Sequence, residues 1–406
     1  ELEAEMFDYY VEKTGAGAVN GTFSGLPQGA DLVVGNVTFA ISYTGGDGND
    51  VTLTVLRVAA TGVERVWTGA VDSLWSTPGN WAGGIVPQPG DSVQFPEVAA
   101  TKKTPHNALP VGYPIHLIRL MAGGYSLGGS GLTLSDGIVQ QASPGTAENK
   151  VTLALVTALG IPPAAQITRL KLQSGGPLSL LPLADFFLTH PDSELRLEND
   201  QPAVQLTCAA SCDGPGFISK AGAGPAILTT PSSHMGGVKV TGGTLIAAVS
   251  GTPGTGVIEV TAPGVLSLGT VGGGAQAFSN AMTVSGSVQS TPGSGTQTCS
   301  GPVELISGQT ANVITAGGAL VFSGVISGDG VLSLSGGTGV SFSGPQPNTW
   351  SGGISISGIL VICNKSAPGT VAIPCDVTVS GHTGALHVPH AGQIASTAEL
   401  SVLARA

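Results

Sequence analysis

The chain has 406 residues, of which 41% are hydrophobic, 10% are charged and 63 are glycine. Disordered chains are poor in apolar residues and rich in charge, so this composition argues against disorder and indicates many short strands joined by tight turns. The net charge is −11 and the 14 lysines and arginines are scattered, so a basic nucleic-acid-binding face is not expected. No apolar run approaches the roughly 18 residues of a membrane span.

The N-terminal stretch ELEAEMFDYYV (1–11) places Leu2, Ala4 and Met6 in alternation with glutamates. Period-two alternation is typical of a strand with one apolar face, although a short helical turn is an alternative. As a strand, this segment would be an assembly strand that pairs with its own chain or with a neighbour. No basic and apolar leader precedes it, so we expect any secretion signal to have been removed or not included.

The sequence GGDGND (45–50) resembles the calcium-binding nonapeptide of secreted β-rolls. The large apolar residue of that motif is displaced by one position, to Leu53. Calcium in that fold is held between successive copies, and this chain has a single copy. We therefore predict an ordinary turn between two strands and no metal at this place.

Three tryptophans, Trp67, Trp75 and Trp81, follow one another closely in a segment that also contains several prolines. Large rings that bury much area are suited to covering the open end of a repeat structure. Exposed rings of this kind can instead stack on sugars. The sequence leaves both interpretations open for these residues and for Trp350, namely a cap or a set of glycan contacts.

The five cysteines are Cys208, Cys212, Cys299, Cys363 and Cys375, and they match no zinc-binding spacing. In an extracellular setting the natural disulfide pairs are Cys208–Cys212 and Cys363–Cys375, which leaves Cys299 over. Connectivity cannot be deduced from sequence, so this pairing is a hypothesis.

A Gly-x-Leu pattern followed by alternation recurs in the second half of the chain. Its copies are GTLIA (243–247), GVLSL (264–268), GALVF (318–322), GVLSL (330–334), GILVI (358–362) and GALHV (384–388). Most spacings between copies fit one or two coils of roughly 20–30 residues. Leu332 and Leu334 fall on one side of a strand, and Ser333 and Ser335 on the other. This pattern predicts a β-solenoid whose coils stack apolar faces in a common interior.

Residues 222–269 and 322–373 share a longer skeleton. In it, a Gly-x-Gly-x-Leu-x-Leu strand leads to an Asn-Thr-Tyr/Trp-Ser-Gly-Gly turn and then to a Gly-x-Leu strand. The turn is clear in NTWSGG (348–353) and looser in SSHMGG (232–237). These motifs resemble the autotransporter-associated β-strand repeat of bacterial surface proteins.

Two N-terminal segments extend the resemblance. Residues 21–55 resemble the segment that closes a tract of such repeats, and residues 65–95 resemble the segment that opens one. A closing segment before an opening one suggests a piece of a longer surface chain or an unusual arrangement. The resemblance covers about half of the chain, and residues 97–210 match no known pattern. It implies a right-handed parallel β-helix that bacteria export for adhesion or as a surface scaffold, and it implies no catalytic residues.

Metal and catalytic sites are not predicted. His382, His387 and His390 lie close in sequence, but a further ligand is missing and strand alternation separates the last two, so we expect isolated histidines. Glycosidase chemistry needs two nearby carboxylates. The acids after residue 213 are thinly spread: Glu259, Glu304, Asp329, Asp376 and Glu399. We predict neither an enzyme nor a cofactor.

The sequence thus predicts an all-β chain, a right-handed parallel β-helix (β-solenoid) with a β-rich N-terminal region. We expect an N-terminal strand segment at 1–58, a β-rich region with a tryptophan cap at 59–210 and solenoid repeats at 211–406. The predicted function is a non-catalytic extracellular structural protein of a bacterial surface that self-assembles through solenoid ends or edge strands into a filament, sheath or surface layer. A monomeric adhesin that binds a surface glycan is the main alternative, and a β-helix carbohydrate-active enzyme is a third.

Overall fold

The computed structural model describes residues 3–5, 8–11, 18–45, 48–152, 167–181, 185–188, 190–381 and 384–403. These residues form short strands and turns, with 3-10 helices at Pro78–Asn80 (η1) and Ala100–Lys102 (η2). Among them, no helix has the length and apolar character needed to cross a membrane. The chain divides into two compact units, one of Glu1–Arg196 with Ala209–Gly216 and one of Leu197–Cys208 with Phe217–Ala406. The division into segments at 1–58, 59–210 and 211–406 remains a prediction from the sequence.

The N-terminal region forms a five-stranded antiparallel sheet. In spatial order its strands are β1 (Glu3–Glu5), β2 (Asp8–Val11), β5 (Asp50–Val58), β4 (Val37–Gly45) and β3 (Asp31–Val34). The predicted β-rich N-terminal region is therefore confirmed. β1 and β3 are the edges of this sheet.

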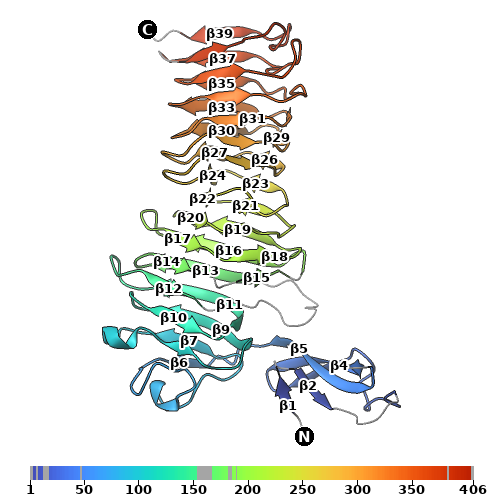
Figure 1. Cartoon of the computed structure of the whole chain (residues 1–406), viewed down its shortest axis with the longest axis vertical. Helices are drawn as coiled ribbons and strands as arrows, with labels where there is room; N and C mark the ends of the chain where they lie inside the picture. The colour runs from blue at the N-terminus through green and yellow to red at the C-terminus, as the bar shows by residue number, and fades with distance from the viewer. Residues whose placement is uncertain are drawn as a thin grey trace. The chain divides into compact units, whose positions relative to one another are not determined.

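The rest of the described chain forms parallel stacked sheets that make a β-solenoid of about 13 turns, which confirms the predicted fold class (Figure 1). The largest sheet has 14 strands: β39 (Leu400–Leu403), β37 (Val377–Ser380), β35 (Ile354–Ser357), β33 (Val331–Gly336), β30 (Thr310–Thr315), β27 (Ser287–Ser290), β24 (Val265–Leu268), β22 (Thr244–Ala247), β20 (Ala226–Leu228), β17 (Leu206–Cys208), β14 (Leu178–Leu180), β12 (Asn149–Val151), β10 (Ser126–Gly129) and β8 (His106–Asn107).

Three further sheets complete the coils. The 12-stranded sheet contains β32 (Ile326–Gly328), β29 (Val303–Leu305), β26 (Met282–Val284), β23 (Ile258–Val260), β21 (Val238–Val240), β19 (Phe217–Ala221), β16 (Glu194–Asn199), β13 (Ile167–Ser174), β11 (Leu132–Gln141), β9 (Tyr113–Leu120), β7 (Ser92–Phe95) and β6 (Glu64–Val66). The six-stranded sheet contains β25 (Gln276–Phe278), β28 (Gln297–Cys299), β31 (Leu320–Phe322), β34 (Val340–Phe342), β36 (Leu360–Cys363) and β38 (Ala385–His387), and β15 (Asp185–Phe187) pairs with β18 (Ser211–Asp213).

The core is built from side chains that stack in register from coil to coil. On the six-stranded sheet, Phe278 pairs with Cys299, which pairs with Phe322, and the column continues to Phe342 and Cys363. All five side chains are buried. Burying a large apolar side chain stabilises a fold by roughly 1.5–3 kcal/mol. Columns of this kind therefore make the main favourable contribution to the free energy of folding.

The predicted alternation within the Gly-x-Leu copies is confirmed in β33. Leu332 and Leu334 are buried, whereas Ser333 and Ser335 are only partly covered. At the corners, glycine allows the backbone of successive coils to approach closely. Gly222 has φ +76°, and a Cβ added to it would lie 2.4 Å from the carbonyl oxygen of Asn199 in the preceding coil, so this corner requires glycine.

Buried amide side chains join successive coils at the corners. Asn149 accepts a hydrogen bond from the backbone N–H of Tyr125 at 2.8 Å. Its Nδ2 donates to the carbonyl of Ala122 at 2.9 Å and to Oε1 of Gln140 at 3.0 Å. A backbone group that leaves the sheet ladder in a dry interior must find another partner, and the asparagine supplies it.

Replacing Asn149 with alanine should destabilise the fold by about 2–4 kcal/mol, because it leaves a buried N–H and a buried carbonyl without partners. Chemical denaturation with circular dichroism measures the change. Asn364→Ala, at an exposed position, is the matched control and should lie within about 0.5 kcal/mol of the wild type. Equal stability of the two variants would show that the amide bridge does not support the corner.

Candidate functional site

The three clustered tryptophans pack against one another and against two further rings of the first coils. The ring centroids of Trp67 and Trp81 are 5.3 Å apart at 76°, and those of Trp75 and Trp81 are 5.8 Å apart at 86°. Phe95 lies 5.5 Å from Trp75 and 5.4 Å from Tyr125. Edge-to-face pairs of this kind add about 0.5–1.5 kcal/mol each to the burial of the rings.

Asn80 shapes the loop that brings these rings together. Its Oδ1 accepts hydrogen bonds from the backbone N–H groups of Val71 and Asp72 at 2.9 and 3.0 Å. Its Nδ2 donates to the carbonyl of Leu74 at 2.8 Å. This buried amide folds the segment between Trp67 and Trp81 back on itself, so that rings from distant positions converge.

The burial of the tryptophans bears on their two predicted roles. Trp67, Trp75, Trp81 and Trp350 are each at most 2% exposed, and Trp350 packs on Phe342 at 5.7 Å. A sugar could stack on these rings only if the core around them opened. The burial is consistent with a cap for the first three residues and gives no support to glycan contacts by any of the four.

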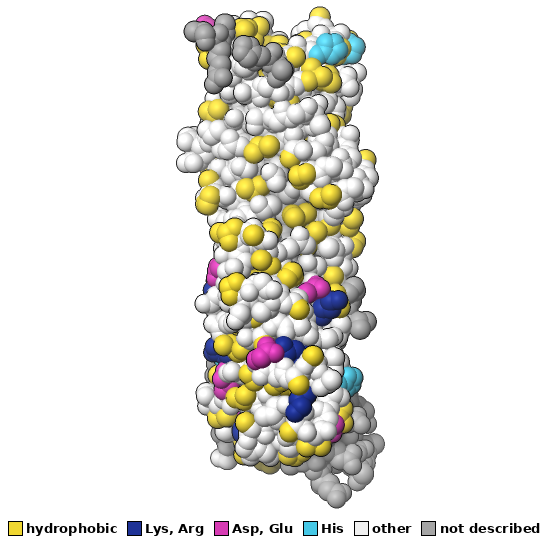
Figure 2. Space-filling model, turned by 90° about the vertical axis from the view of Figure 1, so that its left-hand side faces the viewer, with side chains coloured by type: hydrophobic (Ala, Val, Ile, Leu, Met, Phe, Trp, Pro, Cys, Tyr) yellow, Lys and Arg dark blue, Asp and Glu magenta, His cyan; other side chains and the backbone are white. Residues whose placement is uncertain are grey.

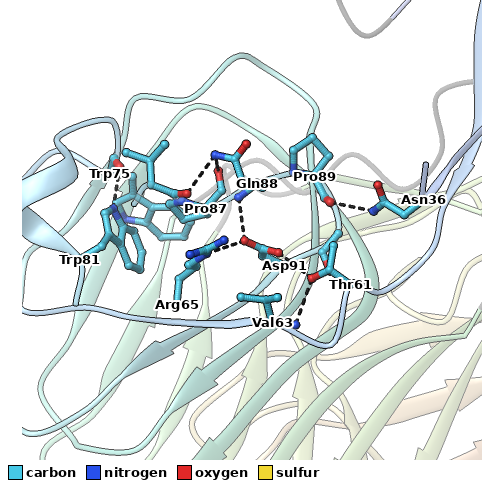
Figure 3. A network of polar contacts seen from close by, with 12 residues as sticks. Asn36, Thr61, Val63, Arg65, Trp75, Trp81, Pro87, Gln88, Pro89 and Asp91 are labelled. Carbon is cyan, nitrogen blue, oxygen red and sulfur yellow. Dashed lines mark hydrogen bonds and ion pairs between the residues drawn. The ribbon is translucent and has the colours of Figure 1, made fainter. Parts of the chain in front are cut away.

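Asp91 organises a polar network next to the tryptophan cluster (Figure 3). Arg65 Nε donates to its Oδ2 at 2.6 Å, Thr61 Oγ1 donates to its Oδ1 at 2.6 Å, and the backbone N–H of Gln88 donates to Oδ2 at 3.0 Å. The carboxylate is buried. Because its oxygens already accept three hydrogen bonds, Asp91 is a structural carboxylate that holds the loop before β7.

The same loop is tied to the N-terminal sheet by Asn36, which follows β3. Its Nδ2 donates to the carbonyl of Ala59 at 2.9 Å. The same Nδ2 donates to the carbonyl of Pro89 at 2.8 Å (Figure 3). One amide thus bridges the segment after β5 and the loop before β7.

Among the described residues, Lys220 and Lys365 are buried, which the sequence did not lead us to predict. Lys220 Nζ donates to the carbonyls of Ala221, Gly222 and Gly242, the last two at 2.9 and 3.1 Å. Lys365 Nζ donates to Oδ1 of Asn348 at 3.1 Å.

Desolvation changes the acidity of both buried lysines. Burial lowers the pKa of Lys220 to about 8, although the carboxylates of Asp200 and Glu198 act in the opposite direction. Burial also lowers the pKa of Lys365 to about 8. The strand alternation could have predicted the burial of both lysines. Lys220 lies two residues after the inward Ile218, and Lys365 lies two residues after the inward Cys363.

The predicted disulfides are wrong, because all five cysteines are buried thiols. Cys208 is in β17 of the 14-stranded sheet and Cys212 in β18 of the two-stranded sheet, so they belong to different sheets. Cys363 ends β36, whereas Cys375 precedes β37 in the 14-stranded sheet. The structure forms no S–S bond between the members of either pair.

The other predicted positions are accounted for as follows. Ala4 lies in β1, opposite Tyr9 of β2, whereas Leu2 and Met6 lie outside the described residues. Of the GGDGND turn, Gly46 and Asp47 also lie outside them, as does His382. Within the described part of the chain, no group of three or more histidine, cysteine or acidic residues could hold a metal. His387 is in β38 and His390 lies in the following turn.

The outer strand β39 is a candidate surface for association. It pairs with β37 in parallel register and is the last strand of the 14-stranded sheet. Leu400, Val402 and Leu403 are 61%, 70% and 60% exposed, whereas the inner strands bury their inward side chains. Within the described part of the chain, no strand pairs with the outer edge of β39, and these three apolar side chains are exposed.

No protein-family model, no curated protein and no solved structure matches this chain.

The five thiols should be unreactive in the native protein. Burial raises the pKa of Cys299 and Cys363 to about 12 and that of Cys375 to about 11, and the thiolate is the reactive form. We expect a thiol-specific reagent at pH 8 to label none of them before unfolding and all five after it. A reductant should leave the melting temperature unchanged, and a drop on reduction would contradict the thiol assignment.

The buried Lys220 should make stability depend on pH. Its folded pKa of about 8 lies below the ordinary 10.5, so from pH 8 to 10.5 the unfolded chain binds more protons and stability rises with pH. Relative to Lys220→Met, the free energy of unfolding of the wild type should rise by about 1–3 kcal/mol over this range. The cysteines ionise in both proteins, so their contribution to the pH dependence cancels when the unfolding free energy of Lys220→Met is subtracted from that of the wild type.

Denaturant titrations at several pH values measure this difference. Lys239→Met, at an exposed position on the adjacent strand β21, is the matched control. A difference between Lys220→Met and the wild type that stays constant from pH 7 to 10.5 would show that the buried ammonium is not destabilised relative to water.

Proposed function

We propose that this chain is a non-catalytic structural protein of an extracellular bacterial surface and that it associates with copies of itself through strand β39. The observation that carries the proposal is that no strand of the described residues pairs with the outer edge of β39, whose three apolar side chains are exposed. The bacterial surface is inferred from the resemblance of the repeats alone.

The outward faces of the coils support a scaffold. In the 14-stranded sheet, Asn312, Ser333, Ser355, Thr378 and Ser401 form one column in register. A second column contains Ser335, Ser357 and Ser380. Figure 2 shows one face of the protein, on which lysine, arginine, aspartate and glutamate side chains are sparse over the C-terminal coils. Such a surface offers hydroxyl groups and little charge that would repel a second copy.

The geometry of β39 favours a defined mode of association. Unpaired edge strands template the addition of another strand. Two identical edges brought together by a twofold axis run antiparallel and make a closed pair. Growth beyond a pair needs a second contact, for which the edge strand β3, with exposed Val33 and Val34, is the candidate. A filament or layer would then use both edges.

The enzyme alternative gains one observation from the structure. Glu259 and Glu304 lie in one outward column of the 12-stranded sheet, with Thr283 between them. Their backbones are two strand spacings, or roughly 9.5 Å, apart, at the upper end of the range for paired glycosidase carboxylates. Both side chains are exposed. This column is the place where a catalytic pair would be tested.

Association should depend on the apolar side chains of β39. We expect the wild type to sediment and elute as dimers or larger assemblies, and Val402→Asp to shift it to monomers, since a charge in an apolar contact is costly. Light scattering after size exclusion and negative-stain electron microscopy measure this.

Val271→Asp is the matched control, because Val271 is a valine of similar exposure in a turn away from β39, and it should leave assembly unchanged. A wild type that is monomeric at every concentration, or a Val402→Asp variant that assembles like the wild type, would refute association through β39.

A further inference from the structure

A cleft of about 250 Å³ lies beside the tryptophan cluster, where the loop after β6 faces helix η2. Its polar lining consists of Asp72, Ser73, Thr101, Lys102 and Thr104, and Val71 is its one large apolar side chain. The association proposed above uses none of these residues. The polar groups come from two segments about 30 residues apart, which successive coils bring together.

Asp72 is held rigidly at one side of the cleft. Its Oδ1 accepts hydrogen bonds from the backbone N–H of Leu74 at 2.8 Å and from Asn80 Nδ2 at 2.5 Å. Its Oδ2 accepts one from Thr77 Oγ1 at 2.9 Å. The Leu74 N–H, with Asn80 and Thr77, lowers the pKa of the Asp72 carboxyl group. A carboxylate accepts about four hydrogen bonds, so one acceptor position on Oδ2 remains for a ligand.

The opposite side of the cleft is also fixed. Trp67 Nε1 donates to the carbonyl of Lys102 at 3.0 Å, which ties helix η2 to the buried ring. Gly69 has φ +55°, and a Cβ added to it would lie 3.1 Å from both Lys102 Cβ and Trp67 Nε1. A side chain here would crowd both groups and would have to adopt a left-handed backbone conformation, so this position favours glycine. The hydroxyl groups of Thr101 and Thr104 are therefore carried on a backbone with a defined position.

The lining groups exclude several kinds of ligand. An anion would meet the Asp72 carboxylate, and a metal cation would meet the Lys102 ammonium. An apolar ligand would find Val71 alone among polar groups. A ligand with a free ammonium group would also meet the Lys102 ammonium. What remains is a neutral molecule with several hydroxyl groups, each able to donate to Asp72 or accept from Lys102, Ser73 and the threonines.

The size of the cleft limits the ligand further. Its volume of about 250 Å³ lies below the roughly 300–1,000 Å³ of sites for drug-sized ligands. One sugar ring fits such a volume better than an oligosaccharide. We propose that the cleft formed by Asp72, Ser73, Thr101, Lys102 and Thr104 binds one neutral sugar residue, free or as part of a glycan.

Saturation-transfer NMR with the full chain tests this binding. The probes are neutral methyl glycosides of several hexoses, with glycine as a zwitterionic probe and inorganic phosphate as an anionic one. We expect saturable binding of at least one glycoside at roughly millimolar concentration, as for a small ligand with one open side. Asp72→Asn and Lys102→Met should each weaken it at least tenfold.

Two further variants keep the test decisive if Asp72→Asn disturbs its loop. Thr101→Val removes one hydroxyl group without changing the size of the side chain and should weaken binding several-fold. Thr310→Val, at an exposed position in β30, is its matched control and should have no effect. The proposal is overturned if no glycoside binds, if glycine or phosphate binds instead, or if binding is the same in the cleft variants. None of these outcomes affects association through β39, which is measured separately.

Discussion

The structure depends on in-register stacking of successive coils. Each strand satisfies its backbone N–H and C=O groups on the strands before and after it, and its inward side chains pack on theirs. Leu334, Ile356 and Val379 form one such continuous column. A shift of one residue in any strand would turn its inward set outward, so a single register is selected along the sheet.

This constraint confines polar groups to defined places. Polar groups of the interior find partners at the corners, where Asn149 bridges two coils and where the ammonium group of Lys220 meets three carbonyls. The flat strands repeat one short pattern and leave hydroxyl columns outside. Side chains of more varied chemical type are therefore found in the loops. Two loops form the cleft beside Trp67.

The two proposals use different parts of the chain for different reasons. The proposed association would rely on β39, whose apolar side chains are exposed and whose outer edge pairs with no strand of the described residues. Sugar binding relies on the loop after β6 and on helix η2, where fixed polar groups surround a cleft. The two proposals are compatible, because association and sugar binding would use separate residues.

The sequence by itself determined the strands and their inward faces, because period-two alternation and glycine at the corners are local properties. The burial of Lys220 and Lys365 was not predicted, although each lies two residues after an inward side chain. Only the tertiary structure decided that the cysteines remain thiols, that the tryptophans are buried and that Asp72 faces Lys102 across a cleft. Those outcomes depend on which residues of different coils and sheets become neighbours, and the lengths and paths of the loops set this. Adjacency along the chain suggested the Cys208–Cys212 and Cys363–Cys375 pairs, but it does not determine which residues become neighbours in the fold.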